Sequence, residues 1–275
     1  MNRRKDMEEV VKGTLMIIGG AEDKKEDCTI LRTLMDLSNA RGGKVVILTA
    51  ATEYPERTAR EYIDVFERLG ASHISAVHIR SRQDADELEK SKLISQASCI
   101  FITGGDQLRI TSIMGGTRTE NALYEAYDNG AIIAGTSAGA SVMSETMIIS
   151  GNNEDAPRKC TLKMAPGLGL LKDAVIDQHF AQRGRIGRLL TAIAQNPHVL
   201  GIGIDEDTGL VVNDNAIFEV IGSNAVTIID GSESDYSNVS ELEPDEILAF
   251  TNIKMHVLPA GYKYNIKTRK PILRR

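Results

Sequence analysis

Short hydrophobic runs alternate with longer amphipathic stretches along the first half of the chain. The runs are TLMIIGG, KVVILTAA, ISAVHI, CIFITGG and AIIAGTS, all rich in small and β-branched residues. Successive side chains of a strand point to opposite faces, so a run that is apolar at every position suits a strand buried on both faces. We therefore predict a parallel sheet built from these runs.

The stretches between these runs have helical spacing. In residues 55–70, Ala59, Tyr62 and Phe66 recur on one face, and Pro55 suits a first turn. DCTILRTLMDLSNARGG and RTENALYEAYDNG have the same character. Strands that alternate with helices indicate a sheet covered by helices on both faces.

The pattern changes in the second half, which is richer in strands. AVIDQHF suits a strand, RIGRLLTAIAQNP a helix, and HVLGIGIDEDTGLVVNDNAIFEVIG strands joined by turns, while the chain from EILAF onward is β-rich. No repeat or linker marks a boundary, so we predict one α/β domain over residues 1–275. Its expected architecture is a three-layer sandwich with a mostly parallel central sheet and a β-rich C-terminal extension.

Composition narrows the classes of function. The 275 residues are 42% hydrophobic and 25% charged, with a net charge of -6, which argues against a nucleic-acid-coating protein. Cys28, Cys99 and Cys160 lack the spacing of a zinc site or a disulfide framework, which favours a reducing compartment. No segment reaches transmembrane length, so we expect a cytoplasmic protein without a membrane or metal partner.

The last of the early runs leads into Gly135-Thr136-Ser137-Ala138-Gly139. A G-x-S-x-G sequence between a strand and a helix is typical of a nucleophile elbow, a tight turn that exposes the serine oxygen. An apolar strand precedes Ser137, and the residues after it are compatible with a helix. We therefore predict that Ser137 is a nucleophile; the alternative is a small residue in a tightly packed loop.

A serine nucleophile needs a base within hydrogen-bond reach. His179 is the best candidate, because it ends the predicted strand AVIDQHF and has polar and charged neighbours in sequence. His73 and His78 flank another strand, and His198 has a capping role open to it at a helix end.

A carboxylate should orient the imidazole and stabilise its charged form. Asp205, Glu206 and Asp207 follow the strand GIGI, at the end of the sheet where active-site loops gather. Spacing leaves open which of the three faces the histidine, and whether they form only a solvated turn. The order serine, histidine, acid differs from that of α/β-hydrolases and counts against that family.

Two further glycines follow the strand in FITGGDQLR. Glycine lets the backbone approach a substrate closely, so the N–H of Gly105 is a candidate to form an oxyanion hole with the N–H of Ala138. A plain strand-to-helix turn capped by Asp106 explains the segment equally well.

Taken together, FITGGDQ, GTSAGA, DQHFAQRGRIGRL and GIGIDEDT resemble the serine-peptidase family that contains cyanophycinases and aspartyl dipeptidases. The resemblance covers nearly the whole chain from Gly13 on. It implies a fold related to class I glutamine amidotransferases, which carry cysteine at the position of Ser137. It also implies that Ser137 is the nucleophile, His179 the general base and Glu206 the acid.

The resemblance further implies a substrate pocket and a substrate. The pocket residues are Gln107, Asp177, Gln178, Arg183, Arg185 and Arg188. The implied substrate is cyanophycin, a polyaspartate with arginine on each β-carboxyl, whose carboxylates and guanidinium groups suit arginine and aspartate partners. Serine chemistry of this kind needs no metal or organic cofactor, and we expect none; the family resemblance suggests a homodimer.

Three alternatives stay open at this stage. A dipeptidase that cuts after N-terminal aspartate would share the elbow and the histidine. A binding module of the same fold would not use Ser137 chemically. Finally, RGRIGR can be read as a helix start whose arginines face water.

Overall fold

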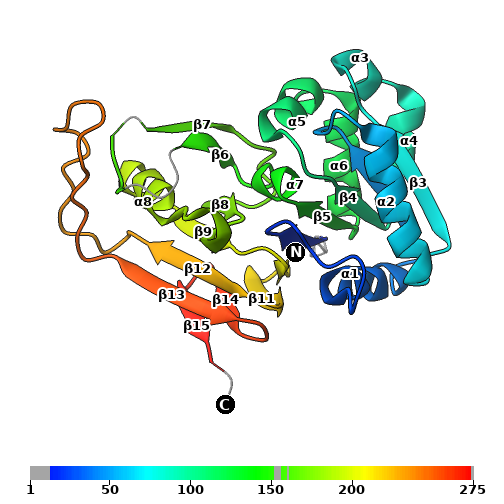
Figure 1. The fold of residues 1–275 in the computed structure, drawn as a ribbon. Helices are drawn as coiled ribbons and strands as arrows, with labels where there is room; N and C mark the ends of the chain where they lie inside the picture. The colour runs from blue at the N-terminus through cyan, green and yellow to red at the C-terminus, as the bar shows by residue number, and fades with distance from the viewer. Residues whose placement is uncertain (1–12, 152–155, 160, 274–275) are drawn as a thin grey trace, which may run out of the picture.

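The structure is a computed structural model that describes residues 13–151, 156–159 and 161–273. Within these ranges the largest sheet has nine strands in the order β15-β14-β11-β10-β1-β5-β4-β2-β3 (Figure 1). Five neighbours are parallel: β1 (Thr14–Ile18), β5 (Ile132–Thr136), β4 (Cys99–Ile102), β2 (Lys44–Thr49) and β3 (His73–His78). The antiparallel strands are β10 (Thr208–Val212), β11 (Ile217–Gly222), β14 (Lys263–Asn265) and β15 (Lys270–Ile272).

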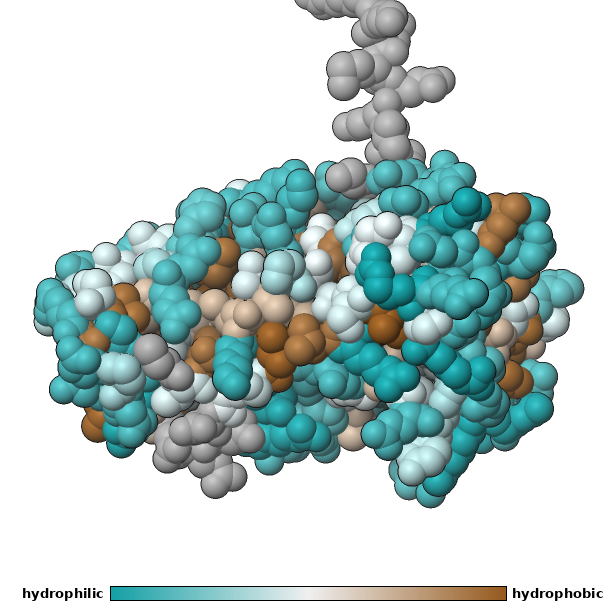
Figure 2. All heavy atoms as spheres, turned by 90° about the horizontal axis from the view of Figure 1, so that it is seen from above, coloured by the Kyte–Doolittle hydropathy of each residue, from teal (hydrophilic) through white to brown (hydrophobic). Residues whose placement is uncertain are grey.

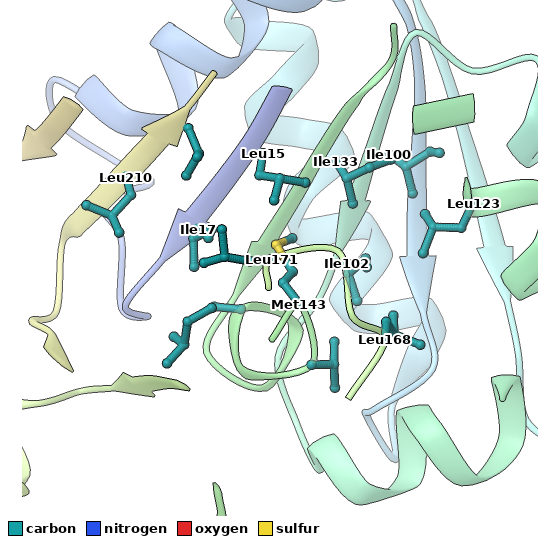
Figure 3. Packing of buried hydrophobic residues seen from close by; sticks show 14 of the residues in the cluster. Leu15, Ile17, Ile100, Ile102, Leu123, Ile133, Met143, Leu168, Leu171 and Leu210 are labelled. Carbon is teal, nitrogen blue, oxygen red and sulfur yellow. The ribbon is translucent and has the colours of Figure 1, made fainter. Parts of the chain in front are cut away.

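Alternate residues of the parallel strands enter two different hydrophobic cores. Met16 and Ile18 of β1 pack on the face covered by α1 (Thr29–Asn39) and α2 (Pro55–Arg68). Leu15 and Ile17 point to the opposite face, where Figure 3 shows them beside Ile133, Met143 and Leu171. This face is covered by α4 (Leu88–Ser95), α5 (Gln107–Met114) and α6 (Arg118–Asp128). Burial on both faces explains why β1, β5, β4 and β2 are apolar at nearly every position. The same expectation is wrong for β3, which lies at the sheet edge with only Val77 buried.

A second sheet lies beside the first and has the order β13-β12-β9-β8. Its members are β8 (Ala174–Gln178), β9 (Leu200–Ile204), β12 (Ala225–Asp230) and β13 (Lys254–Pro259). The helix α8 (Ile186–Gln195) packs on one of its faces, and Ile176 and Ile202 on the other belong to the same core as Leu15. The remaining elements are α3 (Arg82–Ala85), α7 (Ala138–Ser141), the 3₁₀ turn η1 (Ala181–Arg183) and the pair β6 (Thr146–Gly151) and β7 (Leu162–Pro166).

The α/β prediction, with a central, mostly parallel sheet and extra C-terminal strands, is confirmed. Two details differ from it. The strand predicted in AVIDQHF pairs with β9 in the separate sheet, where Gly203 leaves room for Phe180, whose ring a Cβ there would approach to 2.5 Å. Residues 246–250, expected to open the β-rich extension, form only isolated bridges.

The surface seen in Figure 2 is largely hydrophilic, as expected for a chain with 25% charged residues. Figure 2 shows a face covered mostly by hydrophilic side chains, with hydrophobic ones gathered in a short band across its middle. Cys28 and Cys99 are buried and free, whereas Cys160 lies outside the described residues. None of the helices in the described ranges is long and apolar enough to cross a membrane.

Candidate active site

Ser137 occupies a tight turn between β5 and α7. Its backbone has φ 53° and ψ -113°, a conformation that L-residues rarely adopt. The glycines of the G-x-S-x-G sequence make the turn sterically possible. A Cβ on Gly135 would lie 2.3 Å from the carbonyl oxygen of Gly139, and a Cβ on Gly139 would lie 2.2 Å from that of Ile102. The predicted elbow geometry is therefore present.

A histidine and a glutamate line up behind this serine. The Ser137 Oγ lies 3.0 Å from His179 Nε2, and His179 Nδ1 lies 2.6 Å from Glu206 Oε1. His179 directly follows β8 and also has a left-handed backbone, with φ 48°. These are the distances that a serine, its base and an orienting carboxylate require.

The other two acids of the DED sequence have different partners. The Asp205 carboxylate accepts hydrogen bonds from the N–H groups of Ala181 and Ala225. The Asp207 carboxylate accepts from the N–H of Asp23 at 2.8 Å and from the Ser223 hydroxyl. Glu206 is thus the acid that reaches the imidazole, a choice that residue spacing left open.

Burial and charge set the protonation of His179. The residue is 8% exposed. Burial lowers the pKa of His179 below its ordinary value of 6.5; the Glu206 carboxylate opposes this shift, and the cations Arg183 and Arg185 add to it. The imidazole is therefore neutral at neutral pH, the form in which it can accept a proton from Ser137.

The loop between β1 and α1 holds the parts of this site together. The carbonyl of Ile18 accepts from the N–H of Ser137 at 3.0 Å, and that of Gly19 accepts from the N–H of His179 at 2.9 Å. The carbonyl of Gly20 accepts from the N–H of Asp207 at 2.9 Å. This role was not predicted from the sequence, although the glycine pair that ends TLMIIGG is a signal of close backbone approach.

The loop after β4 borders the nucleophile. A Cβ on Gly104 would lie 3.4 Å from the Cβ of Ser137, and Gly105 has φ +139°. Asp106 caps α5 by accepting from the N–H groups of two residues in its first turn. The Asp106 cap is therefore present, while the oxyanion role of Gly105 stays a prediction. The same applies to Ala138, whose N–H, as the first of α7, has no acceptor within the helix.

Three of the expected pocket residues make separate contacts. The side-chain amide of Gln107 donates to the backbone carbonyls of Ile148 and Ile149. The Gln178 Oε1 lies 3.5 Å from Ser137 Oγ. Arg183 is exposed in η1, and within the described residues its guanidinium has no ion-pair partner. Gln178 therefore lies next to the nucleophile and the charge of Arg183 acts on His179, whereas the Gln107 amide is occupied by backbone carbonyls.

The other three pocket residues form a buried cluster. Asp177, Arg185 and Arg188 are 1%, 6% and 7% exposed. Arg188 binds the Asp177 carboxylate through two nitrogens, and Arg185 Nη1 binds it at 3.3 Å. The alternative of arginines that face water is wrong for Arg185 and Arg188. Arg185 Nε is buried without a partner in the described residues, so this cluster keeps one unused donor.

The chemistry available here is acyl transfer. A neutral imidazole contacts a serine hydroxyl on an elbow, and backbone N–H groups border the serine. In the described part of the chain, no group of three or more His, Cys, Asp or Glu side chains could hold a metal ion.

Comparison with known proteins identifies the class of this protein. The family model described as Peptidase family S51 matches residues 15–220, more than half of the chain. The fold and this match define a peptidase. The chain belongs to peptidase family S51.

Curated relatives agree with this assignment, and a solved structure shares the fold. The chain is 34% identical over 267 residues to a cyanophycinase of Geminocystis herdmanii, which covers 97% of this chain and 98% of that protein. It is 35% identical over 260 residues to a cyanophycinase of Synechococcus elongatus, covering 94% of this chain and 81% of that protein. A peptidase from an acI-B1 Actinobacterium shares the fold, with a TM-score of 0.69 at 20% identity over 93% of this chain and 98% of that chain.

Proposed function

We propose that this protein is a serine-type exopeptidase that hydrolyses cyanophycin and releases β-aspartyl-arginine dipeptides. The observation that carries the proposal is the alignment of Ser137, His179 and Glu206 in a chain that resembles cyanophycinases over 94% or more of its length. His179 takes the proton of Ser137, whose oxygen then attacks the carbonyl carbon of a backbone aspartyl bond. The N–H groups of Gly105 and Ala138 stabilise the oxyanion.

The second half of the reaction uses the same histidine. The protonated His179 gives its proton to the leaving amine, which departs and leaves an acyl group on Ser137. A water molecule then passes a proton to His179 and attacks the acyl carbonyl, which frees the dipeptide and restores the hydroxyl. Glu206 keeps the ring in one orientation and stabilises its charged form throughout.

Recognition of the polymer needs charged groups beside the serine. Arg183 is exposed and has no ion-pair partner among the described residues, so it suits a substrate carboxylate, while Gln178 lies within reach of Ser137. We assign Asp177, Arg185, Arg188 and Gln107 to the same pocket from the family resemblance. The first three form the buried ion cluster, and the Gln107 amide is bonded to backbone carbonyls. We further propose, from the family resemblance, that the enzyme is a homodimer, which sedimentation of the purified protein can test. The cysteine usage supports a cytoplasmic location.

The test is incubation of the purified protein with insoluble cyanophycin, with the Ser137→Ala variant as the matched control. We expect the wild type to clear the suspension and mass spectrometry to identify β-aspartyl-arginine, while Ser137→Ala releases none. Cleavage of Asp-X dipeptides with intact polymer would replace the substrate by that of an aspartyl dipeptidase. If neither substrate is cut, and a fluorophosphonate does not label Ser137, the proposal fails.

A further inference from the structure

A buried carboxylate lies beneath the elbow, on the loop between β1 and α1. The Glu22 side chain is 1% exposed, and neither Ser137 nor His179 is among its partners in the described residues. Its Oε2 accepts from the Thr136 hydroxyl at 2.6 Å, and its Oε1 accepts from the Tyr62 hydroxyl at 2.5 Å. A carboxylate withdrawn from water in this way is costly unless its oxygens are bonded, so both contacts are energetically significant.

The two partners tie different parts of the fold to this carboxylate. Tyr62 comes from α2, and Lys24 lies 3.9 Å from the Glu22 Oε1 and 4.3 Å from the Tyr62 ring centre. Thr136 is the last residue of β5 and directly precedes Ser137. Ser137 is held on its other side by the bond from its N–H to the carbonyl of Ile18.

We propose that Glu22 is a positioning residue for the reaction, which acts through Thr136 to hold the elbow in its strained conformation. The inference rests on the proposed function. A turn with φ 53° at a non-glycine residue relaxes unless its surroundings fix it, and Thr136 is the residue through which β5 enters that turn. Relaxation of this turn moves the Ser137 Oγ away from His179 Nε2, and small displacements of reacting groups lower the reaction rate strongly.

The chain offers a matched pair of variants, because each hydroxyl contributes one hydrogen bond to the same carboxylate. Thr136→Val removes the bond next to the nucleophile, and Tyr62→Phe removes the bond to α2. We expect Thr136→Val to slow fluorophosphonate labelling of Ser137 and to lower kcat on cyanophycin by about tenfold or more, with little change in KM. Thr136→Ser, which restores the donor, should restore the rate, and Tyr62→Phe should label as fast as wild type despite a lower unfolding temperature.

A double-mutant cycle tests whether Glu22 acts through Thr136. If it does, the variant with both Glu22→Ala and Thr136→Val labels no more slowly than the slower single variant. If the labelling rate of the double variant falls by the product of the two single losses, the inference is overturned. It is also overturned if Thr136→Val is labelled as fast as the wild type, or if Tyr62→Phe slows labelling as much as Thr136→Val does, because the carboxylate is then purely structural. If a fluorophosphonate does not label the wild-type protein, the proposed function and this inference are both overturned. If the wild type is labelled and Thr136→Val is labelled at the same rate, only this inference is overturned.

Discussion

Ser137 and His179 each have a left-handed backbone, with φ 53° and 48°, and their side chains meet at 3.0 Å. Such conformations persist where the surroundings over-determine them. Here the consecutive carbonyls of Ile18 and Gly19 accept from the two strained residues, so a single strand end fixes both. The reacting pair is therefore aligned by backbone bonds before a substrate binds.

Gly20 gives this arrangement a direct test. A Cβ on Gly20 would lie 2.4 Å from His179 Cε1, whereas a Cβ on Gly130 would meet nothing within 4 Å. Both glycines have positive φ, +100° and +92°, so replacement by alanine strains both, at a cost of about 1 kcal/mol. We expect Gly20→Ala to abolish most labelling of Ser137 by displacing the ring, and Gly130→Ala to lower stability alone. Similar labelling of the two variants would contradict the packing argument.

The charges around His179 predict two opposite pH shifts. The base works in its neutral form, so the acid limb of the labelling rate follows the pKa of His179, which burial lowers below 6.5. Glu206 raises this pKa and Arg183 lowers it. Glu206→Gln should therefore move the limb to lower pH, and Arg183→Gln should move it to higher pH.

The rates of the same two variants should differ as well. Glu206→Gln removes the group that orients the ring, so its plateau rate should fall by a hundredfold or more, roughly. Arg183→Gln should keep most of its labelling rate and lose cleavage of the polymer instead. Stopped-time labelling between about pH 5 and 8, where histidine titrates, provides the measurement. Limbs that move in the same direction would refute the electrostatic assignment.

At the scale of elements, the cluster of Asp177, Arg185 and Arg188 joins β8 to the start of α8 directly behind His179. Burial lowers the pKa of Arg185 to about 10, so this side chain stays charged at neutral pH, and both Arg185 and Arg188 bind the one carboxylate. The sequence shows these residues only as polar positions between 177 and 188, at the end of one predicted strand and the start of a predicted helix. Their pairing follows from tertiary packing, which is why an arrangement of water-facing arginines was an equal alternative before the structure.

Removal of that carboxylate should destabilise the fold. Asp177→Ala leaves two buried cations without a counter-charge, which costs about 3–5 kcal/mol. The control is Glu61→Gln, which breaks the exposed pair of Arg57 and Glu61 on α2 and should cost about 0.5 kcal/mol or less. Urea unfolding followed by circular dichroism compares the two, and equal midpoints would show that the cluster is not a net support of the fold.

Local sequence patterns predict the strands and helices of this molecule better than they predict which of them pack together. The five apolar runs become the parallel strands, and in four of them burial on both faces accounts for the unbroken apolar sequence. The fifth, β3, is an edge strand in which only Val77 is buried. By contrast, the separate sheet of β8 and β9 depends on contacts between distant residues, such as Gly203 beneath Phe180. The role of Glu22 was invisible for the same reason, since Thr136 is far from it in sequence.

At the scale of the whole molecule, one hydrophobic core passes from the large sheet into the smaller one. Leu15 and Ile133 belong to the same cluster as Ile176 and Ile202. The site lies where the two sheets meet, with Ser137 after a strand of the first and His179 after a strand of the second. Activity therefore requires that the two sheets keep their relative position.

This continuity predicts that residues 1–275 unfold as one domain. If the shared core holds the sheets together, the slowest amides of β5 and those of β9 exchange through the same global unfolding, with equal free energies. Hydrogen exchange with mass spectrometry measures both strands in one experiment, and Ile202→Ala should lower both values by the same amount, about 2–5 kcal/mol. A loss confined to β9 would mean that the smaller sheet opens by itself, and labelling of Ser137 should then fall in that variant, because His179 moves with it.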